Sequence, residues 1–298
     1  HKKTTNLLND VEMPRSSGYT TALRNVGAIR NAGVELQLDT RIIDEGVKWD
    51  FGVNLSVNRS KVLSLSDGKD IFGSTVSNTI ISDQLNLMRI GEPMYVFYGY
   101  VEEGYDDNGQ LVYKDLDGSD GITPADKTII GNPNPDCLLN FNTAVSYKGF
   151  TLSAFFQGSI GNDIYSLSMA SAAYDYSSNA NTLREVLYNH WTPEKPDAKY
   201  PNLRQDIALK MSDRFVYDGS YMRLKNLELS YNIPCSKSRV ISKARVYVSA
   251  QNLWTITSYP FWDPDVNAKG GSTSLAQGID ASCYPGARTF TLGCRLVF

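Results

Sequence analysis

The chain has 298 residues and a net charge of −3, from 29 basic and 32 acidic side chains. This balance excludes the basic surface that a nucleic-acid-binding protein needs. No stretch approaches the roughly 18 apolar residues of a membrane-spanning helix, and the N-terminal residues lack the apolar centre of a signal peptide. The opening residues have the character of mid-sequence, so we expect the C-terminal portion of a longer protein.

The first two predicted strands lie at residues 34–42 and 47–57, where apolar and polar side chains alternate strictly. Such alternation is typical of a β-strand whose two faces meet different surroundings. The turn Asp44-Glu45-Gly46 separates them. Each strand is about ten residues long, which is the length that a tilted strand needs to cross a membrane. The sequence therefore predicts an antiparallel membrane-spanning hairpin.

The remaining strands are predicted from similar patterns. In the last of them, every second residue from Phe290 to Phe298 is apolar and the residues between are mostly polar. With the first hairpin, the total is about nine strands. The further predicted strands are residues 95–101, 110–114, 139–147, 150–157, 226–231, 245–251 and 289–298.

Short turns and long connections alternate between these strands. The long connections cover about residues 59–136, 161–220 and 255–286, and the second is predicted to contain a short helix around residues 182–191. This alternation is typical of an up-and-down β-barrel in an outer membrane, with short periplasmic turns and long extracellular loops. Bacterial single-chain barrels close with an even number of strands, so about nine strands are not expected to close alone.

A soluble or surface-attached β-sandwich that binds carbohydrate is the alternative, because alternation also fits a sheet with one wet face. The polar faces favour the barrel, since they carry mostly neutral side chains, whereas a soluble surface is richer in Lys and Glu. In a barrel these side chains line a hydrated channel. They include Asn54, Asn58, Asn140, Asn142, Glu228 and Gln251.

Several ordered motifs resemble the C-terminal third of SusC/RagA-type TonB-dependent transporters of the Bacteroidetes. The resemblance covers nearly the whole chain, and its specificity comes from the order and spacing of the motifs. The motifs are Asn25 to Glu35, Gly131-Asn-Pro-Asn-Pro-Asp136, Tyr147-Lys-Gly-Phe150, Phe155-Phe-Gln-Gly158, Gly161-Asn-Asp-Ile-Tyr165, Tyr221 to Tyr231 and Tyr284-Pro-Gly-Ala-Arg288.

The resemblance implies a 22-stranded barrel that imports glycans or peptides through the outer membrane, in which the nine predicted strands are the last nine. It also implies a SusD/RagB-like surface lipoprotein as a partner. TonB, ExbB and ExbD would drive the transport through an N-terminal part. The plug domain, the TonB box and the first dozen or so strands are expected to lie outside this sequence.

One acidic segment resembles a calcium loop of the EF-hand type. Its expected oxygen ligands are Asp115, Asp117, Ser119, Thr123 and Asp126. The sixth position is Asp120 where the pattern has glycine, and the twelfth is Asp where it has glutamate. A turn in which Asp side chains cap their own backbone is the alternative.

Aromatic side chains in the long connections are candidates for contact with a sugar or with a lipoprotein lid. Packing against one another is the alternative for most of them. The candidates are Tyr174, Tyr176, Trp191, Phe261 and Trp262.

No catalytic arrangement is predicted. The two histidines, His1 and His190, lie near neither a cysteine nor a carboxylate pair at ligand spacing. Asp263 and Asp265 stand two residues apart in a proline-containing loop, which favours a turn over a glycosidase pair. The four cysteines are too widely spaced to indicate a metal knuckle or a redox pair.

Overall fold

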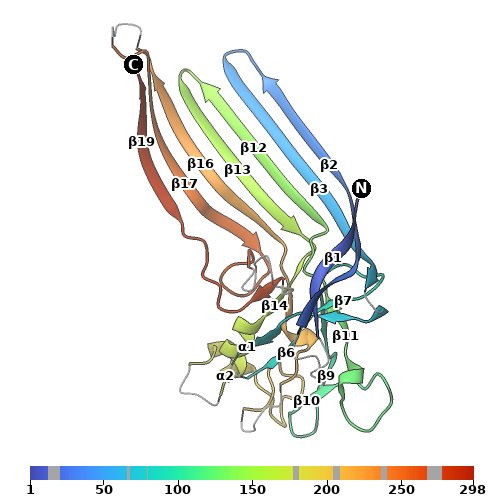
Figure 1. Ribbon diagram of the computed structural model, residues 1–298. Coiled ribbons are helices and arrows are strands. Elements are labelled where there is room, and N and C mark those ends of the chain that lie inside the picture. Colours follow the sequence, from blue (N-terminus) through green and yellow to red (C-terminus); the bar gives the residue numbers. More distant parts are fainter. Residues whose placement is uncertain are drawn as a thin grey trace.

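The computed structural model describes residues 1–12, 21–65, 68–78, 80–176, 181–203, 209–235, 240–266 and 277–298. It has two parts, a large sheet of long strands and a region of short strands and helices at one end of that sheet (Figure 1). The short turns at residues 44–46 and 148–149 lie at the opposite end, together with the C-terminus (Figure 1). Among the described residues, no helix has the length and apolar character needed to span a membrane.

The large sheet contains eight strands, and every neighbouring pair is antiparallel. Long strands that are neighbours in this sheet follow one another along the chain, so the topology is up-and-down. In spatial order the strands are β1 (Lys2–Glu12), β2 (Thr21–Ile43), β3 (Val47–Leu65), β12 (Cys137–Tyr147), β13 (Phe150–Ile160), β16 (Tyr221–Ile233), β17 (Lys243–Thr257) and β19 (Thr289–Val297).

Residues that are paired across neighbouring strands lie on the same face of the sheet, so each row of paired residues belongs to one face. These rows give the sheet one apolar face and one polar face. One apolar row runs through six strands as Trp49, Val145, Leu152, Leu229, Val248 and Leu292. The adjacent row on the polar face is Asp50, Ala144, Ser153, Glu228, Ser249 and Thr291.

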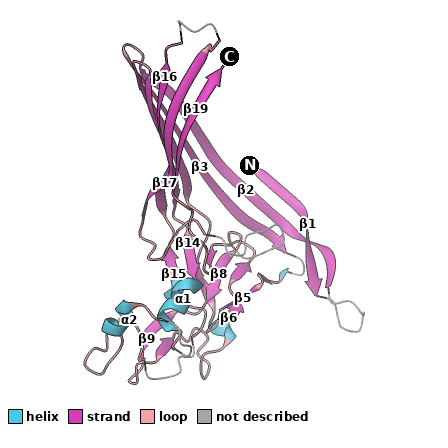
Figure 2. Cartoon of the chain, turned by 90° about the vertical axis from the view of Figure 1, so that its left-hand side faces the viewer, coloured by secondary structure: helices cyan, strands magenta, loops and turns pink. Residues whose placement is uncertain are grey.

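The apolar face is left uncovered. Val34 is 71% exposed and Leu292 is 85% exposed, and no second sheet packs on the described strands (Figure 2). On β17 this face extends from Ala244 to Ile256, about 40 Å along the strand at ~3.3 Å per residue, or about 28 Å of height at a tilt of ~45°. That height matches the roughly 25 Å apolar band of outer-membrane barrels, and a β-sandwich does not fit because its apolar faces cover each other.

The tight turn between β12 and β13 is determined by the backbone conformation of its own two residues. Lys148 and Gly149 have φ values of 45° and 89°, and two consecutive positive φ values are the requirement of the hairpin turns that match the twist of paired strands. The first predicted hairpin is confirmed as β2 and β3, with Gly46 at a φ of 68° in its turn.

Two of the nine predicted strands do not join the large sheet, and one strand of the sheet was not predicted. The aromatic stretch at 95–101 contains β8 (Val96–Gly99), and residues 110–114 contain β10 (Leu111–Tyr113); both belong to small sheets. Val96 is 2% exposed and Phe97 is fully buried, and neighbouring side chains point to opposite faces of a strand, so both faces of this strand are covered. The large sheet therefore has eight strands among the described residues, and the prediction of nine is wrong.

The long connections fold together into what we call the loop domain, the described parts of residues 66–136, 161–220 and 258–288. Its helices are α1 (Leu167–Tyr174) and α2 (Arg184–Asn189), and α2 confirms the helix predicted around 182–191. Its other strands are β4 (Ile71–Phe72), β5 (Thr75–Ser77), β6 (Ser82–Gln84), β7 (Asn86–Met88), β9 (Glu102–Tyr105), β11 (Thr128–Gly131), β14 (Asp163–Ser166), β15 (Val216–Asp218) and β18 (Ile279–Asp280).

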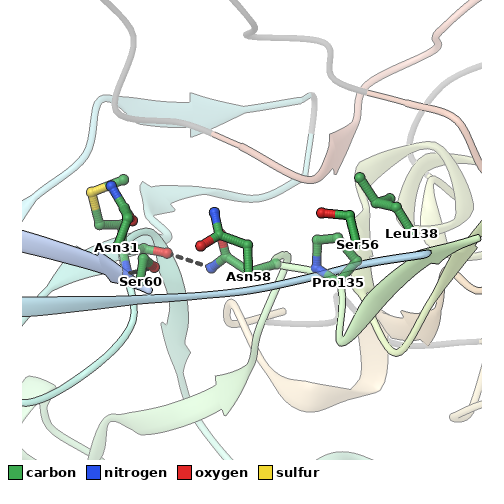
Figure 3. A pocket seen from close by; sticks show the side chains of 8 residues that line it. Asn31, Ser56, Asn58, Ser60, Pro135 and Leu138 are labelled. Atoms are coloured by element: carbon green, nitrogen blue, oxygen red, sulfur yellow. Dashed lines mark hydrogen bonds between the residues drawn. The ribbon is translucent and has the colours of Figure 1, made fainter. Parts of the chain in front are cut away.

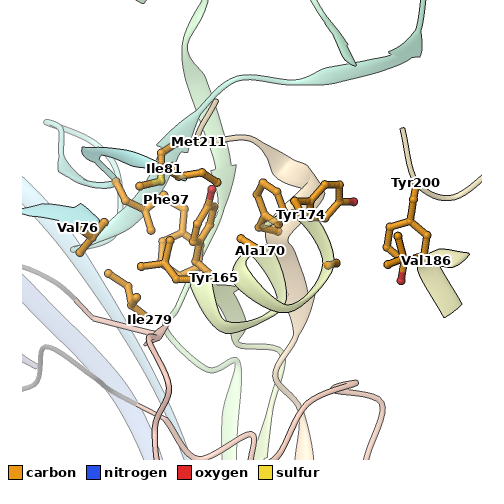
Figure 4. Close-up of a cluster of buried hydrophobic side chains, with 14 residues drawn as sticks. Val76, Ile81, Phe97, Tyr165, Ala170, Tyr174, Val186, Tyr200, Met211 and Ile279 are labelled. Carbon is orange, nitrogen blue, oxygen red and sulfur yellow. The ribbon is translucent and has the colours of Figure 1, made fainter. Parts of the chain in front are cut away.

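The loop domain has its own hydrophobic core, drawn from all three connections (Figure 4). Phe97 comes from the first, Tyr165 and Phe215 from the second, and Ile279 from the third. The Tyr165 ring lies 5.9 Å from that of Phe97 and 6.1 Å from that of Phe215, both at steep angles that favour edge-to-face packing. The long loops are therefore a packed unit at one end of the sheet.

Candidate functional site

The polar face of the sheet is the first part of the candidate site. Asn54 pairs with Asn140, and two positions further along β12 Asn142 is connected to Gln251 through the paired residues Phe155 and Asn226. The predicted channel residues Asn54, Asn140, Asn142 and Gln251 therefore share one face. Small residues make room on this face for larger neighbours. A Cβ added at Gly293 would meet the ring of Tyr247, so this tyrosine lies flat across the neighbouring strand.

Arg223 connects the polar face to the third connection. It is 4% exposed on β16, its Nε donates to Thr255 Oγ1 at 3.0 Å, and its Nη2 forms an ion pair with Asp263. The backbone N–H groups of Asp265 and Gly286 donate to the same carboxylate at 2.9 Å and 3.1 Å. Both oxygens of the Asp263 carboxylate accept hydrogen bonds within the protein, so neither is available for acid–base chemistry, and Asp263 and Asp265 do not form a glycosidase pair.

Burial alone would raise the pKa of Asp263, but hydrogen bonds from the Asp265 backbone and from Arg223 outweigh burial and lower it. The carboxylate therefore stays charged and keeps the loop attached to the wall of the sheet. Next to it, the rings of Phe261 and Trp262 are stacked with centroids 4.9 Å apart and planes 21° apart. Trp262 is 62% exposed, so this pair presents an open aromatic surface.

The other aromatic candidates lie within the loop domain. Tyr174 is 6% exposed in its core and Trp191 is 8% exposed, with its indole against Gly109. Tyr176 is half-buried, and its buried hydroxyl has no hydrogen-bond partner among the described residues. Burial leaves Tyr174 and Trp191 little surface for a ligand, so the exposed Phe261–Trp262 pair is the better placed candidate for contact.

Tyr174 also belongs to a charged cluster that joins two connections. Arg214 forms an ion pair with Glu102, and its Nη1 donates to Tyr174 Oη at 2.8 Å. Burial lowers the pKa of Arg214, but the bond to Glu102 and nearby tyrosines raise it overall. The cluster lines a pocket of about 390 Å³ together with Tyr200 and Tyr217. Because the pair is mostly buried, loss of one partner would leave an uncompensated charge.

The acidic segment brings together three of its five predicted ligands. Carboxylate oxygens of Asp115, Asp117 and Asp126 all lie within 4.8 Å of one another. Asp126 is buried, and its two oxygens accept backbone N–H groups from Leu116 at 2.7 Å and Thr123 at 2.7 Å. These hydrogen bonds lower the pKa of Asp126, and the bond from the Thr123 N–H has the largest effect.

The same segment caps its own backbone elsewhere. Asp115 accepts from the N–H of Gly118 at 2.6 Å, Asp117 from that of Ser119 at 2.8 Å, and the Thr123 hydroxyl from that of Ala125 at 3.2 Å. These hydrogen bonds are the kind that a self-capped turn makes, and they leave both interpretations of the segment open. The three clustered carboxylates suit the oxygen preference of Ca²⁺, and calcium binding remains a prediction.

A pocket at the junction of the two parts of the molecule was only partly anticipated. It is about 330 Å³ in volume and is formed by the polar face and by residues of the first connection. Asn58 is a predicted polar-face residue, whereas Asn31 precedes the first predicted strand and belongs to the Asn25 to Glu35 motif, for which the sequence predicts no role. Arg223 is not among the predicted site residues. A single arginine at a polar-face position within the Tyr221 to Tyr231 motif nevertheless indicates a contact with a charged partner.

No model of a known protein family matches the chain. It is 34% identical, over 99% of its length, to TonB-dependent receptor P3 of Formosa agariphila, and 28% identical over its whole length to TonB-dependent receptor SusC of Bacteroides thetaiotaomicron. The chain spans about a third of the length of these relatives, 31% and 29%.

Solved structures agree with the sequence comparison. The RagAB peptide transporter matches with a TM-score of 0.80 and 25% identity, over 99% of this chain and 32% of the matched chain. The open form of the RagAB peptide importer matches with a TM-score of 0.77 and 26% identity. These likenesses extend over both the sheet and the loop domain, and the chain therefore belongs to the SusC/RagA-type TonB-dependent receptors.

Proposed function

We propose that this chain forms part of the wall and the extracellular loop domain of an outer-membrane importer that takes up oligosaccharides by a TonB-dependent mechanism. A SusD/RagB-like lipoprotein would close the importer from outside, and TonB, ExbB and ExbD would act through a part of the receptor beyond this chain. The chain would contribute transport surface and no enzymatic step, in keeping with relatives described as receptors and as a transporter.

The observation that carries the proposal is the uncovered apolar face, continuous in register from β3 to β19. An apolar surface of this extent requires hydrocarbon around it, and the polar face then lines a hydrated lumen. The loop domain lies at the end opposite the short turns, which corresponds to the extracellular side of such a barrel.

Oligosaccharide is the proposed substrate class because of two features. Trp262 and Phe261 offer an open stacked aromatic surface, which suits the C–H face of a sugar ring. The polar face near the loop domain is lined largely by neutral amides and hydroxyls. The RagAB structures are described as a peptide transporter and importer, so peptide is the competing substrate in any test.

The experiment is deletion of the gene for the complete receptor in its source organism, followed by growth on neutral glycans or peptides as sole carbon source. Growth on a neutral glycan should be lost and should return with the wild-type gene. Purification in mild detergent should yield a receptor of about three times the 33.1 kDa of this chain, with a lipoprotein bound. Unchanged growth on every glycan, with loss on peptides, would contradict the substrate class.

A further inference from the structure

The junction pocket lies where the polar face of β2, β3 and β12 meets the first connection, and its volume is about 330 Å³ (Figure 3). This volume falls in the range of about 300–1,000 Å³ that is usual for small-ligand sites. The residues that line it are Asn31, Ser56, Asn58, Ser60, Met94, Asn134, Pro135 and Leu138.

The frame of the pocket is fixed by hydrogen bonds. Ser60 Oγ accepts from the backbone N–H of Met94 at 3.2 Å, and Asn134 Nδ2 donates to the Met94 carbonyl at 2.7 Å. Asn134 Nδ2 also donates to Asn132 Oδ1 at 2.8 Å. The first connection is thereby attached to the strand wall, and the pocket keeps its shape without a ligand.

Three lining side chains have free hydrogen-bonding capacity. Within the described part of the chain, the side chains of Asn31, Ser56 and Asn58 make no hydrogen bond. A carboxamide donates two hydrogen bonds and accepts two, and a hydroxyl donates one and accepts up to two. Adjacent sugar hydroxyls are themselves donors and acceptors, so two carboxamides in one pocket match them in either direction.

The rest of the lining agrees with an uncharged ligand. None of the eight lining residues is ionisable, so a charged group would enter without a counter-ion. Met94, Pro135 and Leu138 supply apolar surface for the C–H groups of a sugar ring. The pocket therefore combines a polar side and an apolar side, as a pyranose or furanose ring does.

A peptide backbone is less well matched to this site. Extended peptides are commonly captured by adding a strand to an open sheet edge. At the pocket, β2 lies between β1 and β3, since Asn31 pairs with Lys2 and with Ser60. The other edge of β3 is paired with β12 only as far as Ser56, and Val62 exchanges backbone hydrogen bonds with Gly91 and Glu92, so the open edge between them is too short for an added strand. Recognition therefore relies mainly on side chains.

We propose that the junction pocket is a subsite for one uncharged sugar unit of the transported oligosaccharide, held by the carboxamides of Asn31 and Asn58. The inference rests on the proposed function. It assigns these two asparagines a role in ligand binding, beyond that of keeping the lumen hydrated.

The test uses the complete receptor with its lipoprotein, purified in mild detergent. The ligands are oligosaccharides of neutral glucan, fructan, mannan and xylan, a uronate-containing oligosaccharide and a peptide digest, measured by titration calorimetry. Asn58→Leu and Asn31→Leu should each weaken binding of the preferred neutral oligosaccharide about tenfold, as expected when one or two neutral hydrogen bonds are lost. Asn232→Leu is the matched control, because Asn232 is an exposed asparagine at the end of β16 that is farthest from the loop domain, and this variant should bind as the wild type does.

The outcomes separate the two proposals. Binding of a neutral oligosaccharide with equal affinity in all variants would overturn the subsite and leave the proposed function standing. Binding only of uronate-containing oligosaccharides would overturn the uncharged ligand class of the subsite but leave oligosaccharide import standing. Binding only of peptides, or of no ligand in the panel, would overturn both the subsite and the substrate class of the proposed function. Selective loss in the Asn31 and Asn58 variants, with unchanged thermal unfolding, supports the subsite.

Discussion

Arg223 on β16 and Asp263 in the third connection form a buried ion pair that fastens the loop domain to the wall of the sheet. Their side chains are 5% and 10% exposed. The carboxylate also holds the backbone of Asp265 and Gly286, so the pair organises the segment that presents Phe261 and Trp262. A wall residue thus controls the position of an exposed aromatic surface.

Removal of this pair should release the segment. In Arg223→Gln, the Asp263 carboxylate is left buried without its counter-ion, and breaking a buried pair costs about 3–5 kcal/mol. Hydrogen exchange of residues 259–266 in the complete receptor should therefore become much faster. Arg59→Gln is the matched control, because its pair with Asp136 has side chains 57% and 62% exposed and is expected to contribute about 0–1 kcal/mol. Equal protection of residues 259–266 in both variants would contradict the anchoring role.

The same pair predicts a dependence on pH. The pKa of Asp263 is lowered in the folded protein, so its stabilising contribution is present above the unfolded pKa of about 3.9 and is lost as pH falls through the lower folded value. Protection of residues 259–266 should be constant from neutral pH to about pH 4 and should fall below it. Asp263→Asn should remove this acid transition. If the variant kept the transition, another group would be responsible.

The two faces of the sheet make a prediction about adjacent residues on one strand. Val53 pairs with Leu38 and Phe141 on the apolar face, whereas Asn54 pairs with Gln37 and Asn140 on the polar face. Val53→Arg should cost roughly 2–4 kcal/mol if the residue lies near the bilayer midplane, and Asn54→Arg should cost much less. Unfolding of the receptor in lipid vesicles measures both. Similar costs at the two positions would refute the assignment of the faces.

The strands of the wall could be predicted from the sequence where each had two different faces. Val47 to Val57 alternates without a break because each side chain meets either an apolar or a polar surrounding. The same reasoning failed at β8, whose apolar side chains meet a packed core on both faces. It also failed at β1, whose sequence Lys2–Glu12 has no alternation and whose strand is defined by pairing with β2.

The candidate site was less predictable than the wall. Arg223 and Asp263 are 40 positions apart, and their pairing depends on which face of β16 the third connection crosses. The junction pocket likewise needs Asn31 and Asn134, which are brought together by the packing of the first connection onto the sheet. Local patterns identify exposed faces, whereas contacts between connections depend on the assembled fold.

Two substitutions in the acidic segment distinguish a calcium site from a self-capped turn. Asp126→Asn should destabilise residues 115–126 with or without calcium, because both carboxylate oxygens accept buried backbone N–H groups. Asp117 is exposed, and the amide oxygen of an asparagine can still accept the Ser119 N–H, so Asp117→Asn should matter only if a metal ion is bound. Hydrogen exchange with added Ca²⁺ and with a chelator measures this. Protection that rises with Ca²⁺ in the wild type and not in Asp117→Asn would establish a calcium site, and identical protection would leave a self-capped turn.

The last prediction concerns the exposed aromatic pair. Trp262→Ala removes the open member of the stack and should weaken binding of a neutral oligosaccharide by about tenfold, since stacking surface of this kind is expected to contribute about 0.5–1.5 kcal/mol beyond the area that it buries. Trp254→Ala is the matched control. Trp254 is 54% exposed but pairs with Leu224 on the apolar face, where lipid rather than substrate is the proposed surrounding. Affinity from titration calorimetry should fall in the first variant alone. A loss shared by both would point to a general disturbance of the barrel, and a loss in neither would remove Trp262 from the binding surface.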